Sequence, residues 1–256
     1  LPHLLPPEGW NGGDLGTPYQ SVGARGLLSL TSKLMLALFP PSESFLRLKL
    51  GDAAVEAINS AAPQATAEVQ KSLAEVENRF VDEVESLALR PGLSDGLKQW
   101  LLAGNVTLGF PESGGCRVYQ LDRFVRKLDG MGRLMVLILK DMVGRATLPE
   151  RVLEALKEQL AQEPDPKTNL ELYTAIVREQ DGKYCVWQEI MGVEVPDSRV
   201  KYKPDELPWI TLGDGITSGQ SYGYGYMASQ LGDLSSLEGL MRSLVEGSAA
   251  SSRVVF

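Results

Sequence analysis

The chain has 256 residues, of which 43% are hydrophobic and 23% charged, values typical of one or two folded globular domains. Its formal net charge of −8 argues against a protein that grips nucleic acid by neutralising many phosphates, although it leaves open one that handles DNA without holding it. The single histidine, His3, excludes Ser-His-Asp, Cys-His and multi-histidine metal sites. The isolated cysteines Cys116 and Cys185 offer neither a disulfide framework nor a CxxC metal site.

The first distinctive segment is apolar. Residues 1–21 contain four prolines and four glycines and are expected to form an irregular arm. Residues 27–39 then hold nine apolar residues in thirteen, which is too short to span a membrane and lies too far from the start for a secretory leader. We therefore expect a core or interface helix over residues 22–38, ended by Pro40.

Alternation of apolar and basic residues predicts a half-buried strand over residues 45–50. Apolar residues at helical spacing predict an amphipathic helix over 65–89 with an acidic outer face. The Arg90-Pro91-Gly92 run is expected to break that helix, and Ser94 to cap a short helix over 95–103.

From residue 105 the pattern changes to the period of strands, predicted at 106–110, 116–121, 123–128, 133–139, 171–179, 183–190 and 208–216. Residues 129–132 and the Asp181-Gly182 pair are predicted hairpin turns, the second of type I′. An amphipathic helix over 148–161 interrupts the strands, and a joint over 217–226 leads into a last helix over 227–250. Strands joined by tight hairpins predict an α+β fold with a mainly antiparallel sheet.

Chemical motifs are few. The chain has no GxxxxGK[ST] loop, and the GxGxxA match over residues 223–228 lacks the parallel βαβ unit of a dinucleotide site, so it is interpreted as a glycine hinge. The basic residues Arg199, Lys201 and Lys203 are interpreted as a solvated strand edge that could touch phosphate. No catalytic residue, cofactor site or metal site is predicted. The open alternatives are an enzyme with an unrecognised carboxylate or nucleotide site and a DNA-binding module.

Three blocks carry a resemblance: TPYQSVGARGLLSLTSKLMLALFPP at 17–41, LKQWLLAGNVTLGFPE at 97–112 and SYGYGYMASQLGDLSSLEGL at 221–240. In this order they resemble the portal, or head-to-tail connector, proteins of T7-like short-tailed phages (podoviruses). Members of that family are longer, and this chain opens with Leu1 and closes in SSRVVF, so we expect the N-terminal half of such a protein.

The resemblance implies a structural subunit and not an enzyme. It would form a homo-oligomeric ring, usually dodecameric, at the portal vertex of the virion capsid, and would be present in host cytoplasm during assembly. Its implied partners are copies of itself, scaffolding and capsid protein, terminase, tail adaptor proteins and double-stranded DNA that passes through the channel without sequence-specific binding. Neither a cofactor nor a membrane is implied.

The resemblance also implies domains and sites. Residues 22–104 would be the helical part of a wing, 105–220 its antiparallel β part, and 221–256 the truncated start of a stem helix. The helix over 22–38 would pack in the core and meet a neighbouring subunit through Leu27, Leu30, Leu34 and Leu38. The stem helix has an apolar side and a polar side, and its channel-lining or intersubunit residues would be Asp233, Arg242 and Glu246.

Overall fold

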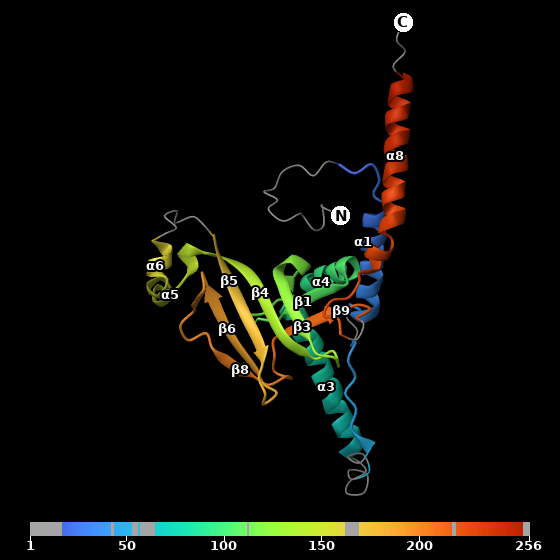
Figure 1. Ribbon diagram of the computed structural model, residues 1–256. Helices are drawn as coiled ribbons and strands as arrows, with labels where there is room; N and C mark the ends of the chain where they lie inside the picture. Colours follow the sequence, from blue (N-terminus) through green and yellow to red (C-terminus); the bar gives the residue numbers. More distant parts are fainter. Residues whose placement is uncertain are drawn as a thin grey trace.

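The computed structural model describes residues 17–41, 44–52, 56, 65–111, 113–161, 169–216 and 219–252. Figure 1 shows a central body of two antiparallel sheets, with one helix projecting from it in each of two opposite directions. The fold is α+β with antiparallel sheets, as the strand pattern predicted. Most of the expected arm over 1–21 lies outside the described residues, and 17–21 contains neither helix nor strand.

The first helix, α1 (Val22–Leu38), has the predicted bounds. Its inner side packs on α4 (Leu89–Ala103) in a core of Leu27, Leu101, Leu102 and Met227. The helix ends at Leu38, and the next residue, Phe39, is not helical because proline disfavours helical backbone in the residue that precedes it.

The predicted strand over residues 45–50 is wrong. This segment pairs with no described strand and instead runs along α3 (Ala65–Ser86), where the Leu48 N–H donates to Glu77 Oε1 at 2.6 Å. Phe45 stacks edge-on against Phe39 and Phe80. Alternation predicts an extended segment with one apolar side, but that side here lies along a helix and is only partly covered, since Phe45, Leu46 and Leu50 are half-buried and Leu48 is 38% exposed.

The predicted helix break at Arg90-Pro91-Gly92 is also wrong in position. The chain turns at Leu87 and at Ala88, which has a φ of 51°, and α4 already begins at Leu89. Pro91 is therefore in the first turn of α4, where a missing N–H costs nothing because it would have no helical partner.

The smaller sheet has three strands in the order β2-β1-β9, all antiparallel: β1 (Asn105–Gly109), β2 (Arg117–Tyr119) and β9 (Trp209–Gly213). The larger sheet has the order β3-β4-β5-β6-β7, with β8 also pairing with β6. Its strands are β3 (Phe124–Leu128), β4 (Leu134–Gly144), β5 (Asn169–Arg178), β6 (Tyr184–Ile190), β7 (Val193–Glu194) and β8 (Val200–Tyr202).

Both predicted hairpins of the larger sheet are present, but the Asp181-Gly182 turn is not of type I′. That type needs positive φ at both central residues, whereas only Gly182 has it, at 84°. The Glu179 N–H bonds to Lys183 O and the Gly182 N–H bonds to Glu179 O, which makes a three-residue loop with glycine in the left-handed position.

The remaining helices are divided into more segments than the sequence predicted. The predicted helix over 148–161 is two segments, α5 (Glu150–Ala155) and α6 (Lys157–Leu160), and 3₁₀ turns occur at η1 (Leu121–Arg123) and η2 (Arg145–Thr147). The predicted last helix is also divided, at Gln230, into α7 (Tyr226–Ser229) and α8 (Leu231–Ser252).

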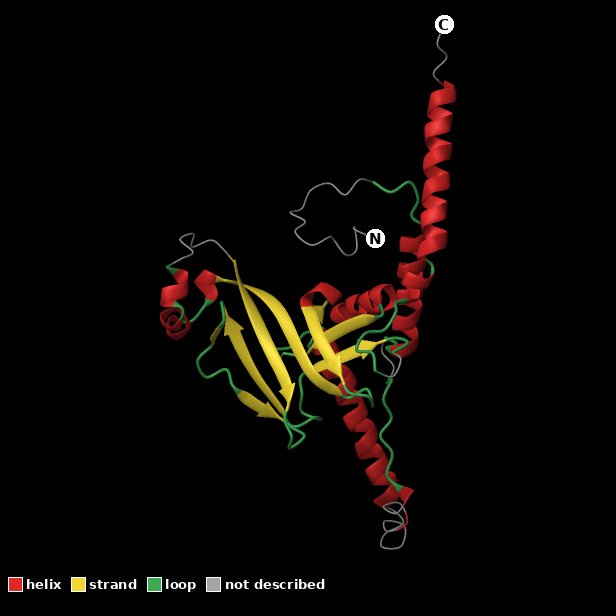
Figure 2. Ribbon diagram, in the orientation of Figure 1, coloured by secondary structure: helices red, strands yellow, loops and turns green. Residues whose placement is uncertain are grey.

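Two further hydrophobic cores hold the body together. The larger core lies between the two sheets, and the smaller one lies where α5 and α6 cover one end of the six-stranded sheet (Figure 2). The buried residues of the larger core are Tyr119, Phe124, Leu137, Leu139, Ile176, Tyr184 and Val186.

Candidate functional site

The described residues contain no cluster of histidine, cysteine and carboxylate side chains that could hold a metal ion. Among the described helices, none combines the length and apolarity that a membrane crossing requires. Within the described part of the chain, features that could carry function include two surface pockets, the segment after β9 and the outer surfaces of α1 and α8.

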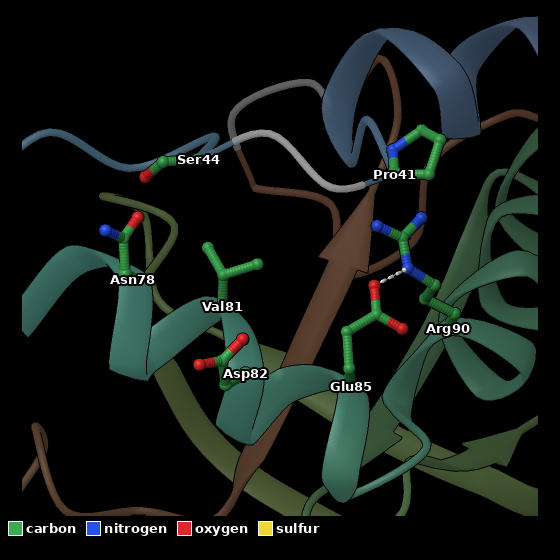
Figure 3. A pocket seen from close by; sticks show the side chains of 7 residues that line it. All are labelled: Pro41, Ser44, Asn78, Val81, Asp82, Glu85 and Arg90. Carbon is green, nitrogen blue, oxygen red and sulfur yellow. Dashed lines mark hydrogen bonds and ion pairs between the residues drawn. The ribbon is translucent and has the colours of Figure 1, made fainter.

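The first pocket, of about 530 Å³, lies between α3 and the segment that follows α1 (Figure 3). Arg90 dominates its chemistry: its Nε donates to Glu85 Oε1 at 2.6 Å, and its two Nη atoms donate to the carbonyls of Phe39 and Pro40 at 2.7 and 2.9 Å. These bonds satisfy carbonyls at the end of α1, so Arg90 braces the junction of α1 with α4.

The second pocket, of about 410 Å³, lies over β2 and β4. The Tyr119 hydroxyl donates to Asp141 Oδ2 at 3.0 Å, and Arg117 pairs with the same carboxylate at 2.9 Å. Burial, with help from the Asp141 charge, raises the pKa of Tyr119 to about 12, so this phenol stays protonated at neutral pH and is no general base.

The GxGxxA segment is a site of close backbone packing. A Cβ atom at Gly223 would lie 1.7 Å from the carbonyl oxygen of Asp214, and one at Gly225 would lie 2.1 Å from that of Leu102. Backbone of the same chain therefore occupies the space against these glycines that a dinucleotide phosphate would need.

Each residue of the basic cluster is paired with a glutamate. Arg199 bonds to Glu194 through two nitrogens, at 2.7 and 3.0 Å, Lys201 bonds to Glu179, and Lys203 bonds to Glu206. The side-chain bond to Glu194 raises the pKa of Arg199. The cluster thus has the balanced charge of a solvated edge.

The predicted residues of α1 divide between two environments. Leu27 is 5% exposed, Leu30 and Leu34 pack at the margin of the same core, and Leu38 at the helix end is half exposed. The sequence interpretation missed Leu28 and Leu36, which are 52% and 63% exposed on the outer side of the helix. The signal was present, since these two lie eight residues apart and project from one face.

Helix α8 buries none of its residues, and Leu240 and Leu244 are 69% and 64% exposed. The three predicted residues do not share one face of it. Asp233 and Arg242 are nine residues apart, two and a half turns, so they lie on opposite sides. Asp233 shares its side with Leu240 and Leu244, which corrects the expected grouping of all three residues on the polar side.

Arg242 and Glu246 form an ion pair at 2.9 Å on the side that faces the N-terminal segment. The Tyr19 N–H donates to Glu238 Oε1 at 2.7 Å, and the Tyr19 hydroxyl donates to Glu246 Oε1 at 3.3 Å. Arg242 lowers the pKa of Glu246 through its hydrogen bond. Residues around Tyr19 therefore lie along this side of α8, as the trace beside the helix in Figure 1 also shows.

Exposed apolar side chains on two helices, above a well-packed α+β body, are typical of a chain that assembles with other chains. Comparison with known proteins is consistent with that class. Residues 8–256 match the family model described as bacteriophage head to tail connecting protein, and the chain belongs to this family.

Similar curated proteins are named portal proteins. The chain is 35% identical to that of Escherichia phage T7 and 34% identical to that of Enterobacteria phage T3, over 100% of its own length and 48% of theirs. It is 26% identical to the portal protein of Enterobacteria phage SP6, over 97% of the chain and 48% of the relative. The chain spans about half the length of the curated relatives that it matches, and these matches do not favour the enzyme alternative.

Proposed function

We propose that this chain is part of the subunit of a phage portal ring. Such a ring would sit at one vertex of the capsid, form the channel through which DNA is packaged and ejected, and bind first terminase and then tail proteins. The observation that carries the proposal is the match of nearly the whole chain to the connector family, together with the name of its relatives.

The arrangement of the elements supports a division into wing and stem. The helices over 22–104 and the sheets over 105–220 make up the body that we assign to the wing. We assign residues 221–256 to the start of the stem, because α8 leaves that body as a projecting helix (Figure 1). A helix of this length with exposed leucines gains stability by packing against another surface.

The outer side of α1 and one side of α8 are our proposed subunit contacts. Full burial of a leucine stabilises an interface by roughly 1.5 to 3 kcal/mol, so Leu28, Leu36, Leu240 and Leu244 together could support association. A ring needs a contact between two different surfaces of each copy, repeated with a rotation that closes. Asp233 lies beside Leu240 and Leu244, and we assign it to the contact as well. Leu38 lies on the same side of α1 as Leu27, but it is 49% exposed at the end of the helix, and we also assign it to the contact.

Arg242 and Glu246 are our proposed channel residues, because they lie on the side of α8 opposite Asp233. Their ion pair is neutral overall, and the chain as a whole is acidic. A wall without excess positive charge would let DNA slide without being retained by its phosphates.

The test is the mass of the assembly by light scattering, with negative-stain images, for this chain and for a longer protein of the relatives' length that contains it. Rings with a central hole from either chain are the expected result. Particles that remain monomeric in both would overturn the proposal.

A paired variant tests the contact. Leu28→Glu with Leu36→Glu should prevent ring formation and leave the monomer folded, because both side chains are exposed. Met131→Glu with Gln180→Glu adds the same charge at the exposed hairpin turns and should leave rings intact. Rings from the α1 variant would remove that helix from the proposed contact.

A further inference from the structure

Arg126 of β3 is a charged residue that is only 3% exposed, and its guanidinium bonds to groups that lie outside the six-stranded sheet. Its Nη1 donates to Leu212 O of β9 at 2.9 Å, and its Nη2 donates to Asn105 Oδ1 of β1 at 2.8 Å. Its Nε donates to Ser221 O at 2.6 Å, in the segment that leads to α7. One side chain thus connects both sheets to the origin of the terminal helix.

The partners of this cation, among the described residues, are carbonyl oxygens and the ring of Tyr222, whose centre lies 5.6 Å from the guanidinium carbon. Burial lowers the pKa of Arg126, because the charged form loses its hydration. Burial of a charge that only neutral groups contact costs desolvation free energy, and an apolar side chain of similar length would cost less. The property that Arg126 adds is geometric, because the planar guanidinium fixes the directions in which its hydrogen-bond partners must lie.

The segment from Ser221 to Gly223 is fixed by further bonds. The Arg126 N–H donates to the Tyr222 hydroxyl at 2.9 Å and the Leu128 N–H donates to Ser221 Oγ at 3.1 Å, so two hydroxyls occupy the open edge of β3. The side chain of Asn105 also bonds both the N–H and the carbonyl of Gly223, each at 2.8 Å.

Glycines let the backbones meet. The space that a Cβ would need is filled by backbone at Gly223 and Gly225, and also at Gly104, which has a φ of 70°. We call these three glycines with Arg126 and Asn105 the joint. Just beyond it, Met227 of α7 is buried in the core of α1 and α4, and α8 begins four residues later at Leu231.

We infer that Arg126 is a positioning residue, which sets the direction in which α8 leaves the two sheets. Two parts of the chain that are far apart in sequence, β1 and the run from β9 to Ser221, converge on its guanidinium, and the second of them leads to α8. The positioning role does not depend on the proposed function, but its consequence does: in a ring, the angle of α8 to the wing would set the width of the channel.

The experiment measures the direction of α8 within one chain. Spin labels are placed at Ser243→Cys on α8 and at Gln180→Cys in the exposed β5–β6 turn, in a Cys116→Ser, Cys185→Ala background. Labelled chains are diluted into an excess of unlabelled chain, so that pulsed electron resonance reports distances inside single molecules whether or not rings form.

Arg126→Lys keeps the charge but loses the planar donors, and we expect a broader distance distribution with a shifted mean. The matched control is Leu156→Ala, which removes a buried side chain from the core under α5 and α6, away from the joint, and should lower stability without changing the distance. Tyr222→Phe removes the hydrogen bond from the Arg126 N–H to the Tyr222 hydroxyl and should broaden the distance distribution less than Arg126→Lys does. If Arg126→Lys does not fold, the Tyr222→Phe distribution tests the inference in its place.

A distribution that stays as narrow as the wild type's in both joint variants would overturn the inference and leave Arg126 with a role in stability alone. The assembly masses of the wild-type chain and of the longer protein are measured in parallel. Monomers from both wild-type proteins, with a broadened Arg126→Lys distribution, would contradict the proposed function and support the inference. Rings from either wild-type protein, with an unchanged distribution, would do the reverse.

Discussion

The joint and α8 are adjacent in the chain but differ in how far their residues are buried and bonded within it. In the joint, a buried cation, an amide and three glycines satisfy one another within a single chain. Helix α8, which follows directly, buries none of its residues and exposes several leucines. The difference supports two of our proposals: that contacts within the chain set the position of α8, and that its exposed leucines contact other chains.

The largest difference between the joint and α8 is expected when a glycine in each of them is replaced by alanine. Gly223→Ala should destabilise the chain by about 4 kcal/mol or more, because its Cβ would meet the backbone oxygen of Asp214, which cannot move aside as a side chain can. Gly239→Ala in α8 meets nothing within 4 Å and should instead stabilise the helix by up to about 1 kcal/mol. Urea unfolding followed by circular dichroism measures both.

Equal effects of the two substitutions would contradict the contrast. A well-tolerated Gly223→Ala would mean that the segment after β9 can shift, and the joint would then be no fixed support for α8.

Sequence patterns predicted much of the body and little of the joint. The bounds of α1 and the hairpins follow from local periodicity and turn residues, which act over a few neighbours. Arg126 was missed because its partners at Asn105, Leu212 and Ser221 are close in space but distant in sequence. In addition, an arginine next to Lys127 in a strand pattern resembles a solvent-facing residue.

The error over residues 45–50 arose because periodicity states that one side of a segment is apolar but does not identify what that side packs against. Only the packed structure shows that this segment runs along a helix. The grouping of Asp233 with Arg242 is a different error, since the seven-residue spacing from Asp233 to Leu240 is visible in the sequence. The polar side of α8 is poorly defined there because apolar residues surround about half of its circumference.

A second comparison replaces one buried leucine and one exposed leucine by alanine. Leu139→Ala, in the core between the sheets, should cost about 3 kcal/mol because it leaves a cavity among residues that are completely buried. Leu240→Ala should change the stability of the monomer by no more than about 0.5 kcal/mol, since that side chain is mainly in solvent. The free energies of unfolding in urea, at a protein concentration where light scattering gives the monomer mass, provide the values.

A large loss at Leu240 in that monomer would indicate that part of the same chain covers α8. In assembled particles the effect of Leu240→Ala should instead be on association, which it should weaken more than it weakens folding. That result would strengthen the distinction between the buried core and the exposed surface of α8.

The smallest effect is expected at the β3–β4 turn, an exposed element that is closed by its own hydrogen bonds. Asp129 Oδ1 accepts the N–H groups of Met131 and Arg133 at 2.9 and 2.8 Å, and Oδ2 accepts Arg133 Nε at 2.7 Å. These bonds, the Arg133 N–H first, lower the pKa of Asp129. A carboxyl group with a lowered pKa stabilises the fold above its unfolded pKa of about 3.9, and this contribution is lost as the pH falls through the lower folded value.

The advantage in stability of the wild type over Asp129→Asn should therefore be constant near neutral pH and shrink only below about pH 4. Asp181→Asn in the β5–β6 turn is the matched control, because Asp181 accepts one backbone N–H, from Lys183, and should show a smaller difference. A difference at Asp129 that does not depend on pH would mean that the asparagine amide replaces the carboxylate bonds. The turn would then owe its shape to Gly132 at a φ of 78° and not to charge, just as the joint owes its close contacts to glycine.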